Sequence, residues 1–264
     1  MKLRRIIALI LALVLLLGLV AGAISVSAEE LETAQKEAWE DNLLVDDPIS
    51  VFAIDKEYIL SVTFLDTLED VPKIHWNMGK NHLEDVQAWV EWQPEGGNVY
   101  FAAEGGINGK DSAEALFKGL SGLKEVKFNG AYHTEQAESL AEMFRDCFRL
   151  ETVDAENLKT DSAESFYCMF TKCRKLKELD LSSWNTEKVT NMGHMFEMCK
   201  KLEKVNVTGW NTEKVTNMEG MFGTCYVLET PDLSSWNVEK VTSYNYFMDW
   251  GCKINDQPWH KFFK

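Results

Sequence analysis

The stretch at residues 179–199 reads LDLSSWNTEKVTNMGHMFEMC, and it recurs as VNVTGWNTEKVTNMEGMFGTC at 205–225 and as PDLSSWNVEKVTSYNYFM at 231–248. Two weaker copies precede it, VDAENLKTDSAESFYCMFTKC at 153–173 and FNGAYHTEQAESLAEMFRDC at 128–147. The copies align at a period of about 26 residues. A fixed period in this range is typical of stacked arrays, in which each unit buries its apolar side only against its neighbours.

Each copy contains two predicted elements. Leu176, Leu179 and Leu181 follow an L-x-x-L-x-L pattern, which predicts a short strand whose alternate residues point to opposite faces. The run from Met192 to Cys199 places its apolar residues at i, i+3, i+4 and i+7, which predicts a short helix. Pro231 weakens the last strand, because proline cannot donate to a ladder. The expected fold class is an α/β repeat solenoid, a leucine-rich-repeat array of short strands and short helices preceded by a small β-rich cap.

The N-terminus has the pattern of an export signal. A short basic segment precedes the apolar run Ile6–Val20, and small residues lead to a predicted cleavage site after Ala28. The alternative is an uncleaved membrane anchor, because the apolar run is nearly long enough to span a bilayer. We therefore expect residues 1–28 to be a signal peptide and the protein to be secreted or held at the cell surface.

The remaining chain divides into four predicted segments. Residues 29–48 are acidic and form either a helix or a mobile leader. Residues 49–110 are expected to form the β-rich cap, since a solenoid's first repeat would otherwise expose its core. The strands expected in this cap are 49–52, 59–65, 86–92 and 99–103. Residues 111–252 form the repeats, and residues 253–264 form a C-terminal cap that folds back over the last repeat.

The charge of the chain restricts its partners. The net charge is −15, and it becomes −18 after signal cleavage, because the first 28 residues carry three basic and no acidic residues. Such acidity argues against binding nucleic acid and anionic membrane surfaces, which favour positive charge. We expect no nucleic-acid partner and no membrane association after cleavage.

Five of the six cysteines occupy the same position in successive copies of the repeat; we call such a position a slot. Their spacings are 26, 26, 26 and 27 residues, for Cys147, Cys173, Cys199, Cys225 and Cys252. Helices packed 8–10 Å apart would hold these thiols beyond disulfide reach, so the interpretation is small buried hydrophobes rather than disulfides. Cys168 falls outside the series and lies about 200° around the predicted helix from Phe166. It is predicted to be an exposed thiol, either free or linking two molecules.

The tryptophans Trp184, Trp210 and Trp236 also share one slot. Evenly spaced rings can stack on a sugar polymer, so a carbohydrate-binding module is one interpretation. The other is that each ring packs at the turn after the strand, which the leucine at position 158 in a weaker copy favours.

No pattern of residues points to catalysis. The segment Gly105–Ser112 resembles a phosphate-binding loop but has the wrong glycine spacing, so we interpret it as a glycine turn. The five histidines lack metal-ligand spacing. We expect no cofactor, no metal, no catalytic residue and no enzymatic activity; a secreted hydrolase with paired carboxylates remains an alternative, because acidic residues are abundant.

The string at 179–199 resembles the repeat of the BspA-like leucine-rich-repeat surface proteins of bacteria. The resemblance extends upstream through SVTFLD (61–66), AWVEW (88–92) and VYFAAEGGING (99–109). It implies adhesion to host proteins and to other cells. The array is short for that family, and no cell-wall anchor or cell-wall-binding repeat is recognised.

The strand residues that lie between the core leucines form the predicted binding face. They are expected to point outward and to contact a protein partner with basic character at a host or cell surface. The alternative is that they only keep the sheet soluble. These residues are Thr152, Asp154, Glu156, Glu178, Asp180, Ser182, Lys204, Asn206, Thr208, Thr230, Asp232 and Ser234.

Overall fold

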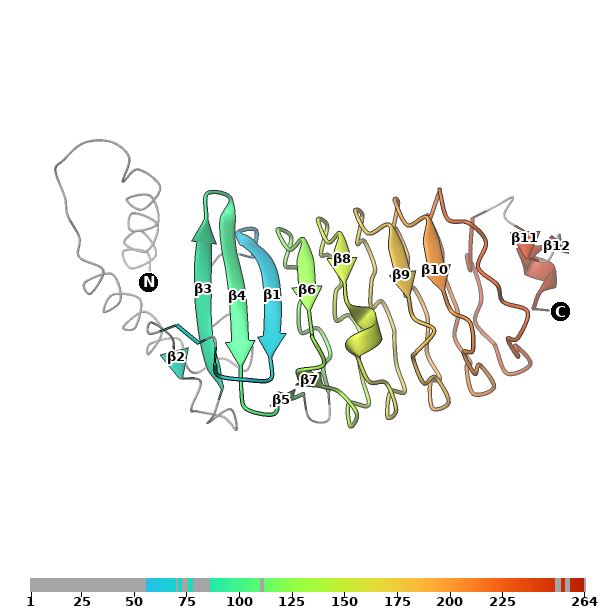
Figure 1. The fold of residues 1–264 in the computed structure, drawn as a ribbon. Helices are drawn as coiled ribbons and strands as arrows, with labels where there is room; N and C mark the ends of the chain where they lie inside the picture. The colour runs from blue at the N-terminus through green and yellow to red at the C-terminus, as the bar shows by residue number, and fades with distance from the viewer. Residues whose placement is uncertain are drawn as a thin grey trace, which may run out of the picture.

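The computed structural model describes residues 56–69, 71–72, 76–77, 86–109, 112–249, 253–254 and 257–263. In it, successive repeats lie side by side along an elongated molecule (Figure 1). The predicted signal peptide, the acidic segment 29–48 and the strand expected at 49–52 lie outside these residues. We call one turn of the chain around the molecule, from one strand to the next, a rung.

The N-terminal strands continue directly into the repeats. Strands β1 (Ile59–Leu65), β3 (Gln87–Gln93) and β4 (Gly96–Ala102) confirm three of the strands expected in the cap. β3 and β4 form an antiparallel hairpin, and β1 pairs in parallel with β4 on one side and with β6 (Glu125–Lys127) of the first repeat on the other. The spatial order of this sheet is β2 (Trp76–Asn77), β3, β4, β1, β6 and β8 (Thr152–Val153). The first repeat therefore has no open strand edge on its N-terminal side.

The repeat strands stack in parallel and in register. β9 (Glu178–Asp180) pairs with β10 (Lys204–Asn206), so that Leu179 lies beside Val205. The short 3-10 helix η2 (Ala155–Asn157) separates β8 from β9 in the chain, and the two strands belong to different sheets. The corresponding residues around the buried Pro231 form no strand, as expected for a residue without an N–H.

The segments that were predicted to be helices are consecutive turns. We call the side of the molecule that they form the turn face; its segments are 112–120, 139–147, 165–173, 191–199, 217–225 and 243–248. The prediction of α-helices there is wrong, because left-handed backbone angles, which end a right-handed helix, occur at two positions in each of the first five segments and at one position in 243–248. Cys168 has φ 56° and Lys172 has φ 66°. The residues in the first position are Ala115, Glu142, Cys168, His194, Gly220 and Tyr246, and those in the second are Gly119, Asp146, Lys172, Met198 and Thr224.

These left-handed residues direct alternate backbone N–H groups toward the next rung. The N–H of Cys168 donates to the carbonyl of Gly193 at 2.9 Å, and that of Phe170 donates to Met195 at 2.8 Å. The N–H groups between them bond within the rung, as from Met169 to Phe166 at 3.1 Å. Every second peptide therefore joins two rungs, which an α-helix, with its bonds confined to one segment, cannot do.

The apolar side chains of the turn face fill the core in columns. Met192, Met195, Phe196 and Cys199 are all fully buried, as their spacing predicted. Rings in the phenylalanine slot stack across rungs with centroids 5.1 to 5.7 Å apart. This separation is close to the strand spacing of about 4.8 Å and well below the 8–10 Å between packed helices.

Polar side chains in the core also bond across rungs. The buried hydroxyl of Thr186 donates to the carbonyl of Asn211 and accepts the N–H of the same residue, at 2.9 and 2.8 Å. The thiol of Cys199 donates to the carbonyl of Phe170 at 3.0 Å. Cys147, Cys173 and Cys199 are free and buried, and Cys225 is also buried, which agrees with the interpretation as buried residues. That interpretation was argued from the wide spacing of packed helices, which does not apply here because the segments of the turn face are turns.

Both ends of the array are covered. A glycine turn, with Gly105 at φ 75° and Gly106 at φ 88°, connects β4 to β5 (Ile107–Asn108), which pairs with β7 (Tyr132–His133). At the C-terminal end, beyond β11 (Lys253–Ile254) and β12 (Gln257–Pro258), the 3-10 helix η3 (Trp259–Lys261) leads to Phe263. The ring of Phe263 lies 4.7 Å from Tyr244 and 4.9 Å from Phe247, so this segment covers the last rung.

Thr224 provides a test of the left-handed positions. It is β-branched at φ 64°, where a Cβ atom is unfavourable, and its N–H donates to Asp249. We expect Thr224→Gly to raise the free energy of unfolding by about 1 kcal/mol, because glycine adopts this conformation without strain. Thr224→Ala keeps the Cβ atom and should give no comparable gain. Urea denaturation measures both variants, and an equal effect of glycine and alanine would contradict the conformation described.

Candidate binding surface

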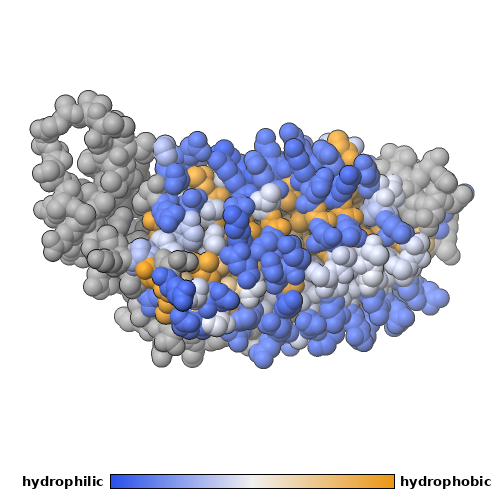
Figure 2. Space-filling view, viewed as in Figure 1, coloured by the Kyte–Doolittle hydropathy of each residue, from blue (hydrophilic) through white to orange (hydrophobic). Residues whose placement is uncertain are grey.

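The predicted binding face lies only partly in strands. Thr152 belongs to β8, Glu178 and Asp180 to β9, and Lys204 and Asn206 to β10, whereas the other seven residues flank these strands or lie around Pro231, where no strand forms. Eleven of its twelve residues are exposed, and Asp154 is half-buried. The register of β9 and β10 places Glu178 beside Lys204 and Asp180 beside Asn206. Figure 2 shows hydrophilic side chains covering most of the visible face of the molecule, with hydrophobic surface between them. The side chains of this face therefore form columns that cross the rungs.

Asp154 differs from the rest of the face in its contacts. Its carboxylate accepts the backbone N–H groups of Phe128 at 2.7 Å and Asn129 at 2.8 Å in the preceding rung. It also accepts the side-chain amide of Asn157 at 3.0 Å. Asp154 thus joins two rungs, and its carboxylate oxygens are already occupied.

Asp180 and Asp232 carry charge that is available to a partner. The hydroxyl and the N–H of Ser182 donate to Asp180 at 2.6 and 3.0 Å, and these bonds lower the pKa of its carboxyl group. Hydrogen bonds from Ser234 likewise lower the pKa of Asp232. Asn206 occupies the same slot and accepts the N–H of Thr208 at 3.1 Å. The slot therefore needs a side-chain oxygen for its turn but not a negative charge.

The tryptophan row is buried. Trp184, Trp210 and Trp236 have exposed fractions of 3%, 2% and 7%, and neighbouring rings stack at 6.3 and 6.0 Å. The indole N–H of Trp210 donates to the carbonyl of Leu181 at 2.9 Å. The rings pack inside the array, so they offer no surface to a sugar polymer.

Cys168 is also buried, with an exposed fraction of 4%, so the prediction of an exposed thiol is wrong. The prediction assumed a helical wheel, but the left-handed backbone at Cys168 turns its side chain away from that direction. Desolvation raises the pKa of the thiol, and hydrogen bonds with Thr171 and Tyr167 oppose this only in part. A thiol of this kind is a poor nucleophile at neutral pH.

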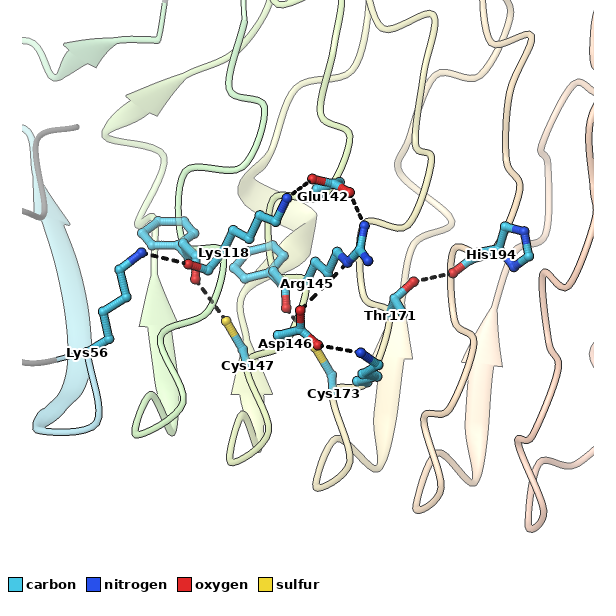
Figure 3. Close-up of polar contacts among 12 residues, drawn as sticks. Lys56, Lys118, Glu142, Arg145, Asp146, Cys147, Thr171, Cys173 and His194 are labelled. Atoms are coloured by element: carbon cyan, nitrogen blue, oxygen red, sulfur yellow. Dashed lines mark hydrogen bonds and ion pairs between the residues drawn. The ribbon is translucent and has the colours of Figure 1, made fainter. Parts of the chain in front are cut away.

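A group of charged residues on the turn face was not foreseen. We call Lys118, Glu142, Arg145, Asp146 and Lys172 the ion cluster (Figure 3). Glu142 forms ion pairs with Lys118 and Arg145, and Lys172 pairs with Asp146 at 3.0 Å. The cluster links three rungs, and each of its carboxylates has a cationic partner. The sequence contains one signal for it, since Asp146 and Lys172 are opposite charges in the same slot of adjacent copies.

The ion cluster has a pH dependence that can be measured. Desolvation would raise the pKa of Glu142, but hydrogen bonds from Lys118 and Arg145 lower it below the ordinary 4.5. A lowered pKa in the folded state stabilises the protein above the unfolded pKa, and this stabilisation is lost as pH falls through the folded value. We expect Glu142→Gln to lower the free energy of unfolding by about 1 kcal/mol at pH 7 and much less at pH 3. Denaturation at both pH values checks this, with exposed Glu138→Gln as the control; a loss independent of pH would contradict it.

Two hollows and two absences describe other parts of this surface. Two hollows have volumes of about 160 and 290 Å³; the first lies beside Tyr246 and Trp259, and the second beside Tyr58 and Arg149. Within the described residues, His, Cys, Asp and Glu side chains do not gather in groups of three that could hold a metal ion. No helix in that part of the chain has the length and apolarity to cross a membrane.

Comparison with known proteins identifies one family. Two overlapping segments, residues 112–182 and 171–262, match the family described as Mycoplasma protein of unknown function, DUF285. Together they span residues 112–262, which is more than half of the chain and includes the stacked repeats. No curated protein and no solved structure matches the chain. The chain therefore belongs to the DUF285 family.

Proposed function

We propose that this chain is a non-enzymatic binding protein whose repeats form a leucine-rich-repeat-like solenoid of the BspA-like type. It acts outside the cell or at its surface, and its strand face contacts a protein partner on a host or another cell. The observation that supports this most is the set of exposed polar columns on the strands. The residues of β9 and β10 lie in register, and hydrogen bonds across the rungs fix the backbone, which makes a preorganised contact surface.

The charge of the face favours a basic partner. Asp180 and Asp232 have lowered pKa values, so both carry a negative charge at neutral pH. Glu156 and Glu178 add exposed negative charge nearby, and Lys204 is the one basic residue among the twelve. Complementary charge speeds association and excludes partners of like charge.

Two observations favour binding over hydrolysis. A general acid needs a raised pKa, whereas the pKa of Glu142, the carboxyl group of the ion cluster with two cationic partners, is lowered. The thiol of Cys168 has a raised pKa, which is the opposite of an activated nucleophile. The sugar-binding alternative depended on the tryptophan row and loses its support, because those rings are buried.

The proposal is tested by removing charge without disturbing the turns. In Asp180→Asn/Asp232→Asn, the amide oxygen still accepts the turn N–H, as Asn206 does in the wild-type chain. We expect the affinity for a protein captured from a surface-protein extract to fall roughly tenfold in biolayer interferometry. Asp154 is left unchanged, because its loss would weaken the fold.

The matched control is Glu187→Gln/Glu239→Gln, which makes the same charge change at exposed positions on a different turn of the rung. This variant should bind as the wild type does. Equal affinities of all three proteins for the captured partner would refute the assignment of the strand face.

A further inference from the structure

A second surface of the molecule has the opposite charge. Between the turn face and the strands, each rung makes a short turn, and in three consecutive rungs these turns carry exposed cations. We call this surface the basic edge; its residues are Arg149, Arg174, Lys175, Lys200 and Lys201. It stands out on a chain with a net charge of −15.

The cations of the basic edge are in register and lack acidic partners. Arg149, Lys175 and Lys201 occupy one slot of three successive copies, and Arg174 and Lys200 occupy the slot before it. Within the part of the chain that the structure describes, none of the five forms an ion pair. The ion cluster, by contrast, pairs Asp146 with Lys172 in neighbouring rungs. Stacked like charges repel one another, so the basic edge weakens the array rather than stabilising it.

Aromatic rings flank these cations at both ends. Tyr226 follows them in the slot of Arg174 and Lys200, is 68% exposed, and has the ammonium of Lys200 6.0 Å from its ring centre. At the other end Tyr58 is 47% exposed and lines the 290 Å³ hollow together with Arg149, but Glu57 and Glu95 also line this hollow. The guanidinium of Arg174 lies over the ring of Phe148 at 4.7 Å. The surface thus combines regularly spaced positive charges with exposed aromatic rings.

This combination suits a linear ligand that carries both negative groups and apolar faces. The cations repeat at about the 4.8 Å spacing of the rungs, a pitch comparable to that of a polysaccharide with one charge per sugar. Sugar rings present C–H faces that stack on tyrosine. Duplex nucleic acid fits less well, because its charges are spaced about 1.7 Å apart, much more closely than the cations of neighbouring rungs.

We propose that the basic edge binds a linear anionic polysaccharide, with Arg149, Lys175 and Lys201 contacting its carboxylate or sulfate groups and Tyr226 stacking on a sugar at one end. The ligand crosses the rungs along the edge. This site is separate from the strand face, so it can exist whether or not that face binds a protein.

The test uses the full chain without its first 28 residues and four probes. Heparin carries sulfates as well as carboxylates, and alginate carries one carboxylate on each sugar, while dextran is neutral and a single-stranded oligonucleotide carries phosphates. We expect heparin or alginate to bind and dextran not to bind, in calorimetry at low salt. The polymer that binds identifies the anionic group that the site prefers.

Lys175→Glu/Lys201→Glu should lower the affinity for that polysaccharide at least tenfold. The control Lys214→Glu/Lys240→Glu makes the same charge change at exposed positions on a different turn and should change the affinity less than twofold. Tyr226→Ala should weaken binding most at high salt, where charge is screened and stacking remains. Thermal unfolding confirms that each variant is folded.

Three outcomes would overturn the proposal. The first is that neither anionic polysaccharide binds at low salt. The second is an equal loss of affinity in both lysine variants, which would show only an effect of net charge. The third is that the oligonucleotide binds as tightly as the polysaccharide and Tyr226→Ala has no effect, which would identify a general polyanion surface.

Discussion

The backbone hydrogen bonds between rungs on the turn face are the interaction on which the rest of the structure depends. They form because left-handed residues, two in each of the first five segments, turn alternate N–H groups out of their own rung, as Cys168 and Lys172 do. Left-handed geometry costs about 1–2 kcal/mol per non-glycine residue. Each backbone hydrogen bond between rungs stabilises the fold by about 1 kcal/mol. The bonds repeat from Ala113 to Phe247, and together with the strands they hold adjacent rungs in register on both sides of the core.

Register explains the composition of the repeat. When each rung lies directly over the last, identical side chains meet, so a residue that bonds or stacks with itself suits every copy. Phenylalanine rings stack, threonine hydroxyls bond the next backbone, and cysteine thiols donate to carbonyls of the preceding rung. The same register places the charged side chains of neighbouring rungs beside one another. The ion cluster alternates signs in one slot, whereas the basic edge repeats one sign and so leaves its cations for a ligand.

Much of this could be predicted from the sequence. The period located the rungs, and the apolar positions of Met192–Cys199 were correctly expected to be buried. The helix predicted for these residues was wrong. Two consecutive turns of about four residues bury the same i, i+3, i+4 and i+7 positions, so the spacing does not distinguish them from a helix. Gly119 and Gly220 occupy the left-handed slots in two copies and were the available clue. The error at Cys168 followed from the helix, and the role of Asp154 depended on backbone N–H groups of another rung, which no local pattern reveals.

The most direct test of this account is the detection of individual hydrogen bonds on the turn face by NMR scalar couplings between amide nitrogens and carbonyl carbons. The amide of Cys168 should couple to the carbonyl of Gly193, and that of Phe170 should couple to Met195. Couplings of Cys168 to Glu164 and of Phe170 to Phe166 would instead indicate an α-helix. That result would contradict the stacking of the rungs described for this protein.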